Sequence, residues 1–329
     1  PSLVFPVSRP QSFLFGMPLD GKCDETIDKL GIGNSGSFPH LRIHANGREA
    51  GHGVDLQEPR AAVVEHEVDA CHVAAADRMP RGAAEGADGL GDAAAMDGYM
   101  REWRQIWTGR SPLVLRPGST AEVSRILAIA NETRTVIVPQ SGNTGLCGGQ
   151  IPTDTGNEVV LSLDRMTRIL DVDPADNTIT VEAGAVLESV QDAADAVDRL
   201  FPLSLASEGS CRIGGNLSTN AGGVNVLRYG MTRDLTLGLE VVLADGRVIS
   251  SLSALRKDNT GYDLRQWFIG AEGTLGVITA ASLKLFPLPK RHGTAIVAVP
   301  SVKDAVELLA KLRAGSGDRV SSFELLPRA

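Results

Sequence analysis

The chain has 329 residues, 43% of them hydrophobic and 22% charged, and a formal net charge of −8. These proportions indicate a globular protein with room for two domains and a sizeable core, and no apolar run reaches the length of about 20 residues that spans a membrane. Residues 1–97 hold 15 acidic against 8 basic side chains, so residues 98–329 carry a net charge of only −1. A nearly neutral body argues against nucleic acid as a partner.

Residues 1–97 differ from the rest of the chain. They contain five of the six histidines, show no sustained helix or strand periodicity, and begin with proline instead of methionine. The histidine spacing gives no H-E-x-x-H motif, and no basic segment precedes an apolar stretch as in a targeting peptide. We therefore expect residues 1–97 to be an unassigned extension that is disordered or not native to the protein.

The cysteines indicate a reducing environment. Cys23, Cys71, Cys147 and Cys211 show no paired spacing of the kind found in disulfide frameworks or zinc sites. Free thiols persist in reducing compartments, so the pattern predicts a cytoplasmic protein.

Between residues 98 and 200 the pattern predicts strands and helices in alternation. An apolar segment at 113–117 is followed by Ser119 and Glu122, whose spacing forms a capping box at the start of a helix. Beyond this helix the chain favours strands at residues 136–139, 159–163 and 178–182 and a helix over 186–200. Together these elements predict a small β-α-β-β subdomain.

The remaining residues predict an antiparallel subdomain and the beginning of another unit. Asp245-Gly246 lies between apolar runs at 239–243 and 247–249, which is a strong β-hairpin signal. A further strand is expected at 276–285, before the proline-rich segment 287–289. From residue 290 the chain favours a strand at 294–299, a helix over 302–313 that begins at Ser301 and ends at Gly315, and a strand at 320–326.

The most informative segment is a glycine-rich loop at residues 138–149, VPQSGNTGLCGG. It is predicted to join two buried strands, so it does not open a helix as the G-x-G-x-x-G turn of a Rossmann fold does. It also lacks the Gly-Lys-Ser/Thr of a P-loop. The functional alternative that remains is a nest of backbone N–H groups that holds an anion, and the structural alternative is a plain tight turn.

Two further segments share this composition. Residues 202–223 read PLSLASEGSCRIGGNLSTNAGG, and residues 259–278 read NTGYDLRQWFIGAEGTLGVI. Loops of this length are uncommon in compact domains and are usually functional, although the first could be an Ω-loop packed on itself. Together the three segments could hold a long, phosphate-bearing ligand by backbone contacts.

These three segments resemble, in their order and in nearly all of their residues, the FAD-binding domain of the vanillyl-alcohol oxidase/p-cresol methylhydroxylase (PCMH-type) superfamily. Residues 255–279 are most similar to D-2-hydroxyglutarate dehydrogenases, with D-lactate dehydrogenases and glycolate oxidase subunits as near relatives. The resemblance implies an α+β fold, in which residues 98–289 form a PCMH-type FAD-binding domain of two α+β subdomains with FAD between them. Residues 290–329 would then be the truncated start of a substrate-binding cap domain.

The resemblance also implies which residues hold the cofactor. The first loop would wrap the pyrophosphate through its N–H groups, and the second would lie near the isoalloxazine and phosphates, with glycine at 214 and 215 admitting the ring. The third would contact the adenine end through Val277 and Ile278. The implied FAD-binding residues are Pro139, Gln140, Ser141, Gly142, Asn143, Thr144, Gly145, Ser210, Gly214, Gly215, Asn216, Thr219, Asn220, Glu272, Gly273, Val277 and Ile278.

Asn143 falls where several relatives carry the histidine that bonds covalently to the flavin. Asparagine cannot form this bond, so the resemblance implies non-covalent FAD.

The resemblance implies the oxidation of a D-2-hydroxy acid, with D-2-hydroxyglutarate as the first choice of substrate. A hydride would pass from C2 of the substrate to N5 of the flavin, and a partner would then accept the electrons. In that branch the catalytic histidine, the carboxylate-binding residues and the metal ligands come from the cap and beyond. No positions here match them, so the catalytic residues are unknown, no metal site is expected, and the chain alone could be inactive. His292, the only histidine after residue 97, is a weak candidate for the base.

Two alternatives stay open. The protein could be a relative that oxidises D-lactate or glycolate, or a non-catalytic FAD-binding subunit or truncated gene product.

Overall fold

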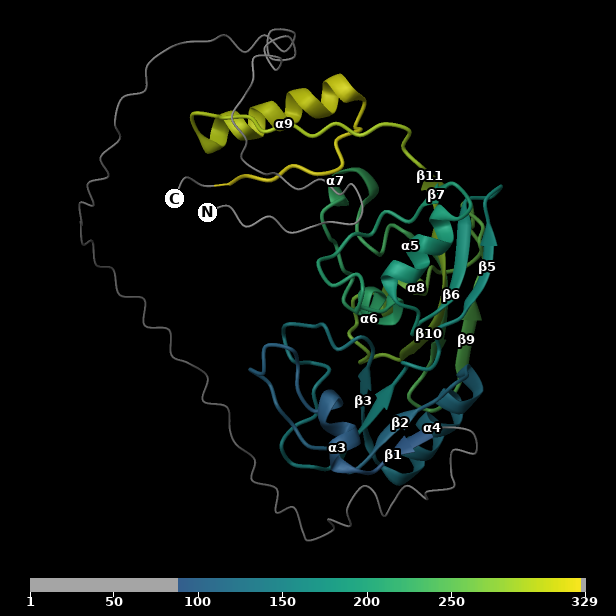
Figure 1. Ribbon diagram of the computed structural model, residues 1–329. Helices are drawn as coiled ribbons and strands as arrows, with labels where there is room; N and C mark the ends of the chain where they lie inside the picture. Colours follow the sequence, from purple (N-terminus) through teal and green to yellow (C-terminus); the bar gives the residue numbers. More distant parts are fainter. Residues whose placement is uncertain (1–87, 327–329) are drawn as a thin grey trace, which may run out of the picture. The chain divides into compact units, whose positions relative to one another are not determined.

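A computed structural model describes residues 88–326 (Figure 1). The expectation of a disordered or non-native extension therefore lies, except for its last ten residues, outside the described part of the chain. These last residues, 88–97, form a short strand, β1 (Asp88–Leu90), and a helical turn, α3 (Ala93–Met96), which continues into the 3-10 turn η1 (Asp97–Tyr99).

The first sheet has four strands in the order β1-β2-β4-β3. Strands β2 (Val114–Arg116), β4 (Glu158–Ser162) and β3 (Val136–Gln140) run parallel, and β1 adds to β2 in the antiparallel direction. β4 is buried as expected, whereas β3 lies at the edge of the sheet and leaves Val136 55% exposed. The prediction that both flanks of the glycine-rich loop are buried strands is therefore correct only for β4.

Helix α4 (Thr120–Thr133) connects β2 to β3 and begins as predicted. The Ser119 hydroxyl accepts a hydrogen bond from the Glu122 N–H at 3.3 Å, and the Glu122 carboxylate accepts one from the Gly118 N–H at 2.8 Å. Four residues at helical spacing are buried: Val123, Ile126, Leu127 and Ala130. Burying an aliphatic side chain of this size contributes about 1.5–3 kcal/mol, so packing, more than capping, holds this helix in place.

The second sheet is antiparallel throughout, in the order β5-β6-β10-β8-β9. Its strands are β5 (Ile169–Asp173), β6 (Thr178–Glu182), β10 (Val277–Lys284), β8 (Thr236–Val242) and β9 (Val248–Ser251). β5 was not predicted. The sequence predicted β6 to belong to the first subdomain, but β6 pairs with β10 in the second sheet. On its other side, β10 pairs with β8, which forms the predicted hairpin with β9. Local periodicity identifies a strand and does not reveal its neighbours.

Helix α4 touches both sheets, through contacts with β3 and with β8. The tip of the β8–β9 hairpin reaches the helix, where the Ser124 hydroxyl donates a 2.5 Å hydrogen bond to the Gly246 carbonyl. Gly246 adopts φ +86°, and a Cβ there would lie 2.7 Å from the Ser124 carbonyl oxygen. The glycine of the Asp-Gly turn is thus required for the turn and for its contact with α4.

Several predicted segments take a different form. The helix expected over 186–200 is α5 (Leu187–Asp195), and the chain then turns through Asp198 at φ +56° into β7 (Arg199–Leu200), which pairs with β11 (Phe286–Pro287). Two glycine-rich segments contain short helices that were not predicted, α6 (Ile213–Ser218) and α8 (Arg265–Phe268). A third unpredicted helix, α7 (Val226–Tyr229), follows the second segment.

After residue 290 the only regular element in the described part is α9 (Val302–Ser316). Ser301 caps it as predicted, by accepting from the Asp304 N–H at 3.2 Å, but it ends at Gly317 (φ +62°) and not at Gly315. The strands predicted at 294–299 and 320–326 are not formed. A strand requires a hydrogen-bonded neighbour, and these residues have none in the part of the chain that the structure describes.

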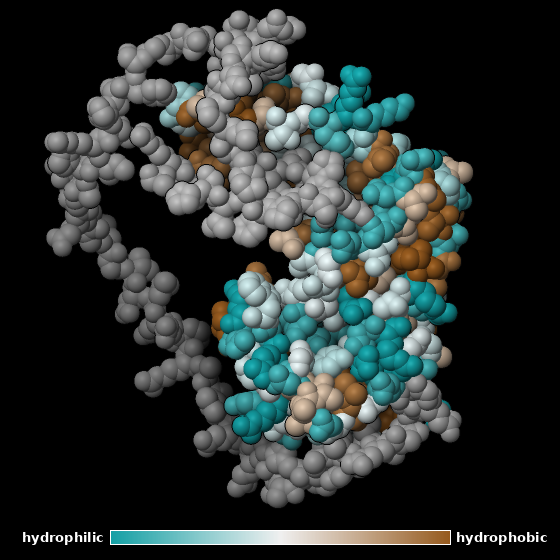
Figure 2. Space-filling model, viewed as in Figure 1, coloured by the Kyte–Doolittle hydropathy of each residue, from teal (hydrophilic) through white to brown (hydrophobic). Residues whose placement is uncertain are grey.

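On the face shown in Figure 2, hydrophilic residues predominate in the lower part, and hydrophobic residues form separate patches. Among residues 88–326, no helix is long and apolar enough to cross a membrane.

Candidate functional site

The three glycine-rich segments meet in space. The Ser141 hydroxyl in the first accepts a 3.2 Å hydrogen bond from the Gly215 N–H at the start of α6. At the other end of α6, the Ser218 carbonyl accepts a 2.9 Å bond from the Glu272 N–H in the third segment. The third segment then returns to the first, where a Cβ on Gly273 would lie 3.1 Å from the Pro139 ring. Segments separated by about 130 residues along the chain thus close into one ring of contacts.

A pocket of about 450 Å³ lies between these segments, within the size range of small-molecule sites. Of the residues that the sequence implicated, those lining it are Pro139, Gln140, Ser141, Gly142, Asn143, Thr144, Gly145, Gly214, Gly215, Asn216, Thr219, Glu272, Gly273, Val277 and Ile278. Their role as ligand contacts stays a prediction. The geometry establishes that they surround one space.

Two implicated residues, Ser210 and Asn220, do not line the pocket. The Ser210 carbonyl supports Gly142 from behind, since a Cβ on that glycine would lie 2.6 Å from it. Asn220 adopts φ +49° and turns its side chain towards the Arg233 N–H, from which it accepts a 3.0 Å hydrogen bond. Both residues shape the neighbourhood of the pocket from outside.

The glycines of α6 line the pocket and also allow close packing within the chain. A Cβ on Gly214 would lie 2.8 Å from the Ala183 Cβ, and one on Gly215 would lie 3.2 Å from the Ser141 Cβ. The missing side chains therefore allow α6 to pack against the residue that follows β6 and against the first loop. The expectation that these glycines admit a flavin ring stays a prediction. The Gly214 N–H donates a 2.7 Å hydrogen bond to the Ala183 carbonyl, consistent with close backbone packing.

The first loop presents a row of free backbone donors. In the part of the chain that the structure describes, the N–H groups of residues 142–147 donate to no protein acceptor. Asn143 adopts a left-handed conformation (φ +52°) in the middle of this row. Successive N–H groups around a left-handed residue form an anion-binding nest, so the loop has the donor set that a phosphate-bearing ligand requires.

Two glutamines hold the ends of this loop together. Gln140, 3% exposed, donates from Nε2 to the carbonyl oxygens of Tyr99 and Gln150, each at 2.9 Å. The Gln150 side chain donates to the Gly145 carbonyl at 2.9 Å and to Asn143 Oδ1 at 3.2 Å. The loop is therefore preorganised without a ligand. Gln150 lines the pocket and was missed by the sequence reasoning, although it lies one residue beyond the motif.

Arg212 was also missed. It lines the pocket just before α6, and its Nη1 donates to the carbonyl oxygens of Asp164 at 3.3 Å and Gly184 at 2.5 Å. A guanidinium at the pocket wall supplies positive charge where an anionic ligand would lie. The only signal in the sequence was a single basic residue within an otherwise small and neutral segment.

The thiols near the pocket differ in character. Cys147 is exposed and lines the pocket, whereas Cys211 is buried. Burial raises the pKa of the Cys211 thiol, so this residue behaves as a packing group, and the Asn216 amide donates to its Sγ at 3.6 Å.

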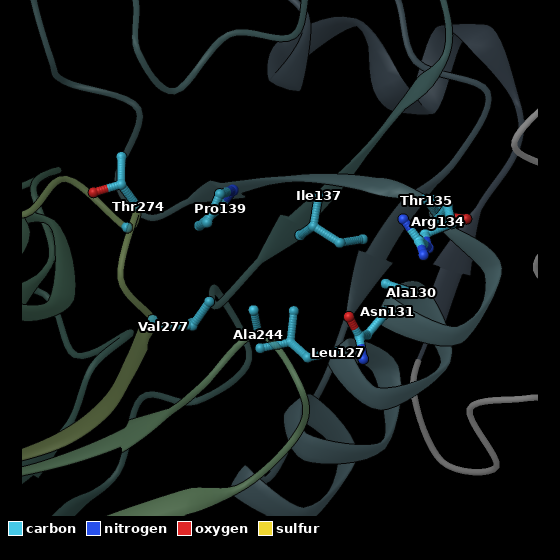
Figure 3. A pocket seen from close by; sticks show the side chains of 12 residues that line it. Leu127, Ala130, Asn131, Arg134, Thr135, Ile137, Pro139, Ala244, Thr274 and Val277 are labelled. Atoms are coloured by element: carbon cyan, nitrogen blue, oxygen red, sulfur yellow. The ribbon is translucent and has the colours of Figure 1, made fainter.

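A second pocket of about 340 Å³ adjoins the first (Figure 3). The two share Pro139, Gly273, Gly276 and Val277. Ile137, Leu127 and Ala244 line its apolar middle, and Asn131, Arg134 and Thr135 lie at the end remote from Thr274. The two pockets thus share part of their wall, and the second adds an apolar middle with polar groups at one end.

Residues 88–326 contain no group of three or more His, Cys, Asp or Glu side chains that could hold a metal ion. His292, the weak candidate for a base, is exposed in a segment without regular structure and does not line the pocket.

The fold and the site define a class of protein. Residues 111–251, which hold the first two glycine-rich segments, match the family model described as FAD binding domain. The match covers somewhat less than half of the chain. A solved structure of alkyldihydroxyacetonephosphate synthase has a TM-score of 0.58 and 21% identity, and the match covers 69% of this chain and 43% of that one. This likeness confirms the predicted α+β fold.

Curated relatives are considerably more similar in sequence. Over 225 residues the chain is 46% identical to "D-2-hydroxyglutarate dehydrogenase, mitochondrial" of Danio rerio, which covers 68% of this chain and 42% of the relative. It is 41% identical over 230 residues to a D-2-hydroxyglutarate–pyruvate transhydrogenase of Saccharomyces cerevisiae, with coverages of 70% and 46%. The sequence-based resemblance is confirmed, and the chain spans less than half the length of these relatives.

The cytoplasmic location predicted from the cysteines is wrong. The relatives from Danio rerio and Bos taurus are both named as mitochondrial proteins. A lack of paired cysteines argues only against oxidising compartments and does not distinguish among the others.

Proposed function

We propose that this chain binds FAD in the pocket formed by its three glycine-rich segments. The observation that carries the proposal is the row of unsatisfied N–H groups at residues 142–147, inside a loop that belongs to an FAD binding domain. These donors suit the pyrophosphate, and Arg212, which also lines the pocket, adds positive charge. The implicated residues that line the pocket would be the contacts, through their backbone more than their side chains.

The adenine end fits the adjoining pocket. Val277, implied to contact adenine, lines both pockets and is only 5% exposed. The apolar walls formed by Leu127, Ile137 and Ala244 suit a flat heterocycle, and the polar groups of Asn131 and Thr135 provide hydrogen-bonding partners at the far end. On this arrangement the dinucleotide extends from α6 towards the C-terminal end of α4.

We further propose that FAD is held non-covalently. The Asn143 side chain is engaged on both of its polar atoms, because Nδ2 donates to the Gly98 and Arg101 carbonyls at 3.0 and 2.9 Å and Oδ1 accepts from Gln150. A neutral amide held in this way is no nucleophile for a flavin carbon.

The proposed reaction is the oxidation of a D-2-hydroxy acid, with D-2-hydroxyglutarate as the first choice because relatives 41–46% identical are named for it. When bound, FAD supplies the acceptor for the hydride that leaves C2 of the hydroxy acid. The contribution of this chain is to bind and orient the cofactor. Among the described residues, the pocket lining includes no histidine that could act as the catalytic base. The electron acceptor and the domain boundaries at 98–289 and 290–329 stay predictions.

The test is made on the purified 329-residue chain. Titration with FAD should give a saturating change in the flavin spectrum, and acid precipitation should leave all the flavin in the supernatant. Flavin that remains with the precipitate would exclude the non-covalent assignment, and a chain that takes up no flavin would exclude the proposal as a whole.

Substrate assays separate the remaining alternatives. D-2-hydroxyglutarate, its L enantiomer, D-lactate and glycolate are each mixed anaerobically with the FAD-loaded chain. Because the described lining holds no histidine, we expect flavin reduction to be very slow with all four. Rapid reduction by D-lactate or glycolate alone would replace the first choice of substrate, and a complete lack of reduction supports a purely FAD-binding role for this chain.

A further inference from the structure

Residues 98–110 run along the whole length of the loop at residues 140–153 and contact it at each step. The Tyr99 carbonyl accepts from Gln140 at 2.9 Å, the Arg104 guanidinium donates to the Leu146 carbonyl, and the Arg110 N–H donates to the Thr153 carbonyl at 2.8 Å. No residue of this segment lines the pocket. We call residues 98–110 the brace.

Side-chain packing reinforces these hydrogen bonds. Gly148 adopts φ +82°, and a Cβ there would lie 2.6 Å from the Trp107 ring, so the indole packs directly on the loop backbone. The neighbours of Gly148, Cys147 and Gly149, both line the pocket. The Trp107 side chain is 49% exposed, so the ring covers the loop without being buried in the core.

Asn143 joins the brace to the pocket. Its amide nitrogen donates to two brace carbonyls, Gly98 and Arg101, and its oxygen accepts from Gln150 within the loop. These three hydrogen bonds hold Asn143 in the left-handed conformation, among the N–H groups of residues 142–147 that have no protein acceptor in the described part of the chain.

Glu102 holds the brace itself together. Its side chain is buried, and its carboxylate accepts hydrogen bonds from the Arg104 N–H at 2.6 Å and the Ile106 N–H at 2.7 Å, with a longer one of 3.4 Å from Trp107. Burial raises the pKa of this carboxyl, but the hydrogen bonds from the three N–H groups outweigh burial and leave the pKa below its usual value. The ionised carboxylate therefore fixes the tight turn between the bridged residues Arg101 and Thr108.

We infer that the brace, fixed internally by Glu102 and joined to the loop through Asn143, positions the loop N–H groups for the phosphates of the bound dinucleotide. Glu102 is thus a positioning residue for a ligand that it does not touch. The inference rests on the proposed FAD binding, and it adds that affinity is set by a segment outside the pocket.

The test compares Glu102→Gln with the wild-type chain. Glutamine keeps the shape of the side chain but replaces one acceptor oxygen by a donor that faces backbone N–H groups, so the turn should loosen. We expect FAD affinity to fall at least tenfold. In the absence of FAD, amide hydrogen exchange should accelerate in residues 98–110 and 140–153, while β8 and β10 keep their protection. The matched control is Glu307→Gln, an exposed glutamate on α9, which should change neither quantity.

A second pair of variants covers the case in which Glu102→Gln does not fold. Asn143→Gly keeps access to positive φ and removes all three side-chain hydrogen bonds, so loop exchange should accelerate in the same way. Asn177→Gly is its control, because Asn177 also adopts positive φ (+55°) and lies outside the pocket.

The outcomes separate the inference from the proposed function. If the wild-type chain takes up no FAD, the proposed function is wrong. Wild-type chain that binds FAD, together with a folded Glu102→Gln that binds equally well or shows unchanged loop exchange, overturns the brace alone.

Discussion

At the scale of single residues, the glycines of this protein act mainly by letting backbones meet. Gly142 approaches the Ser210 carbonyl and the Cys211 Cα, and Gly214 approaches Ala183. The sequence showed that these positions must be small, but it did not show what they touch. A glycine-rich motif is compatible with ligand approach and with chain packing, and the structure shows the packing contacts.

Gly142→Ala should destabilise the protein by about 1–3 kcal/mol, because the new methyl group would lie 2.6 Å from the Ser210 carbonyl oxygen and 2.8 Å from the Cys211 Cα. The measurement is urea unfolding without FAD. Gly149→Ala is the matched control in the same loop, since its nearest neighbour would be Glu272 Oε2 at 3.5 Å, an ordinary contact. Equal stability of the two variants would contradict the packing role of Gly142.

Tyr99 should titrate unusually late. Burial, and then a 2.7 Å hydrogen bond donated to Asp164, raise the pKa of this phenol from 10.0 to about 12. A raised pKa means that the folded state favours the protonated form, so the stabilisation is complete below pH 10 and is lost as the pH rises towards 12. In a phenolate absorbance titration of the native protein, Tyr99→Phe should remove the step near pH 12. Persistence of that step would show that it belongs to another group.

At the scale of elements, the sequence predicted best where local chemistry decides the structure. The capping box of α4, the Asp-Gly hairpin of β8–β9 and the start of α9 are each specified by residues no more than three positions apart. It failed where distant partners decide. β6 belongs to the second sheet only because β10, about 100 residues later, pairs with it, and α6 forms within a glycine-rich segment because both of its ends are bonded to other segments.

Ser119→Ala should lower the free energy of unfolding by about 1 kcal/mol, because the Glu122 N–H loses its acceptor at the start of α4. Ser119→Asp retains an acceptor and should be close to wild type in the same chemical denaturation experiment. Since α4 contacts both sheets, the loss should appear in the global transition. A loss confined to local fraying of the helix would contradict the central position of α4.

At the scale of the whole molecule, the candidate site was largely predictable as a set of segments and only partly as a set of residues. The three segments were recognisable from composition and resemblance, and they do converge. The contributions of Gln150, Arg212 and the second pocket were not predictable, because they depend on how the segments pack in three dimensions and not on residue type alone.

FAD should stabilise the folded chain by mass action. If only the folded state binds, free FAD at 100 times its dissociation constant adds about 2.7 kcal/mol, which is measured as a rise in melting temperature that grows with the logarithm of the FAD concentration. Riboflavin lacks the phosphates that the loop N–H groups would hold, so it should give a much smaller rise. Equal shifts from both compounds would argue against the phosphate role of residues 142–147.

The position of β10 has a consequence for synthesis on the ribosome. This strand is the central member of the second sheet although it is the last of the five to be made, and its first residues, Val277 and Ile278, complete the pocket wall. A nascent polypeptide released shortly before residue 277 would lack the strand that joins β6 to β8. On the proposed function, FAD binding therefore becomes possible only after β10 has been made and has joined the two halves of the sheet.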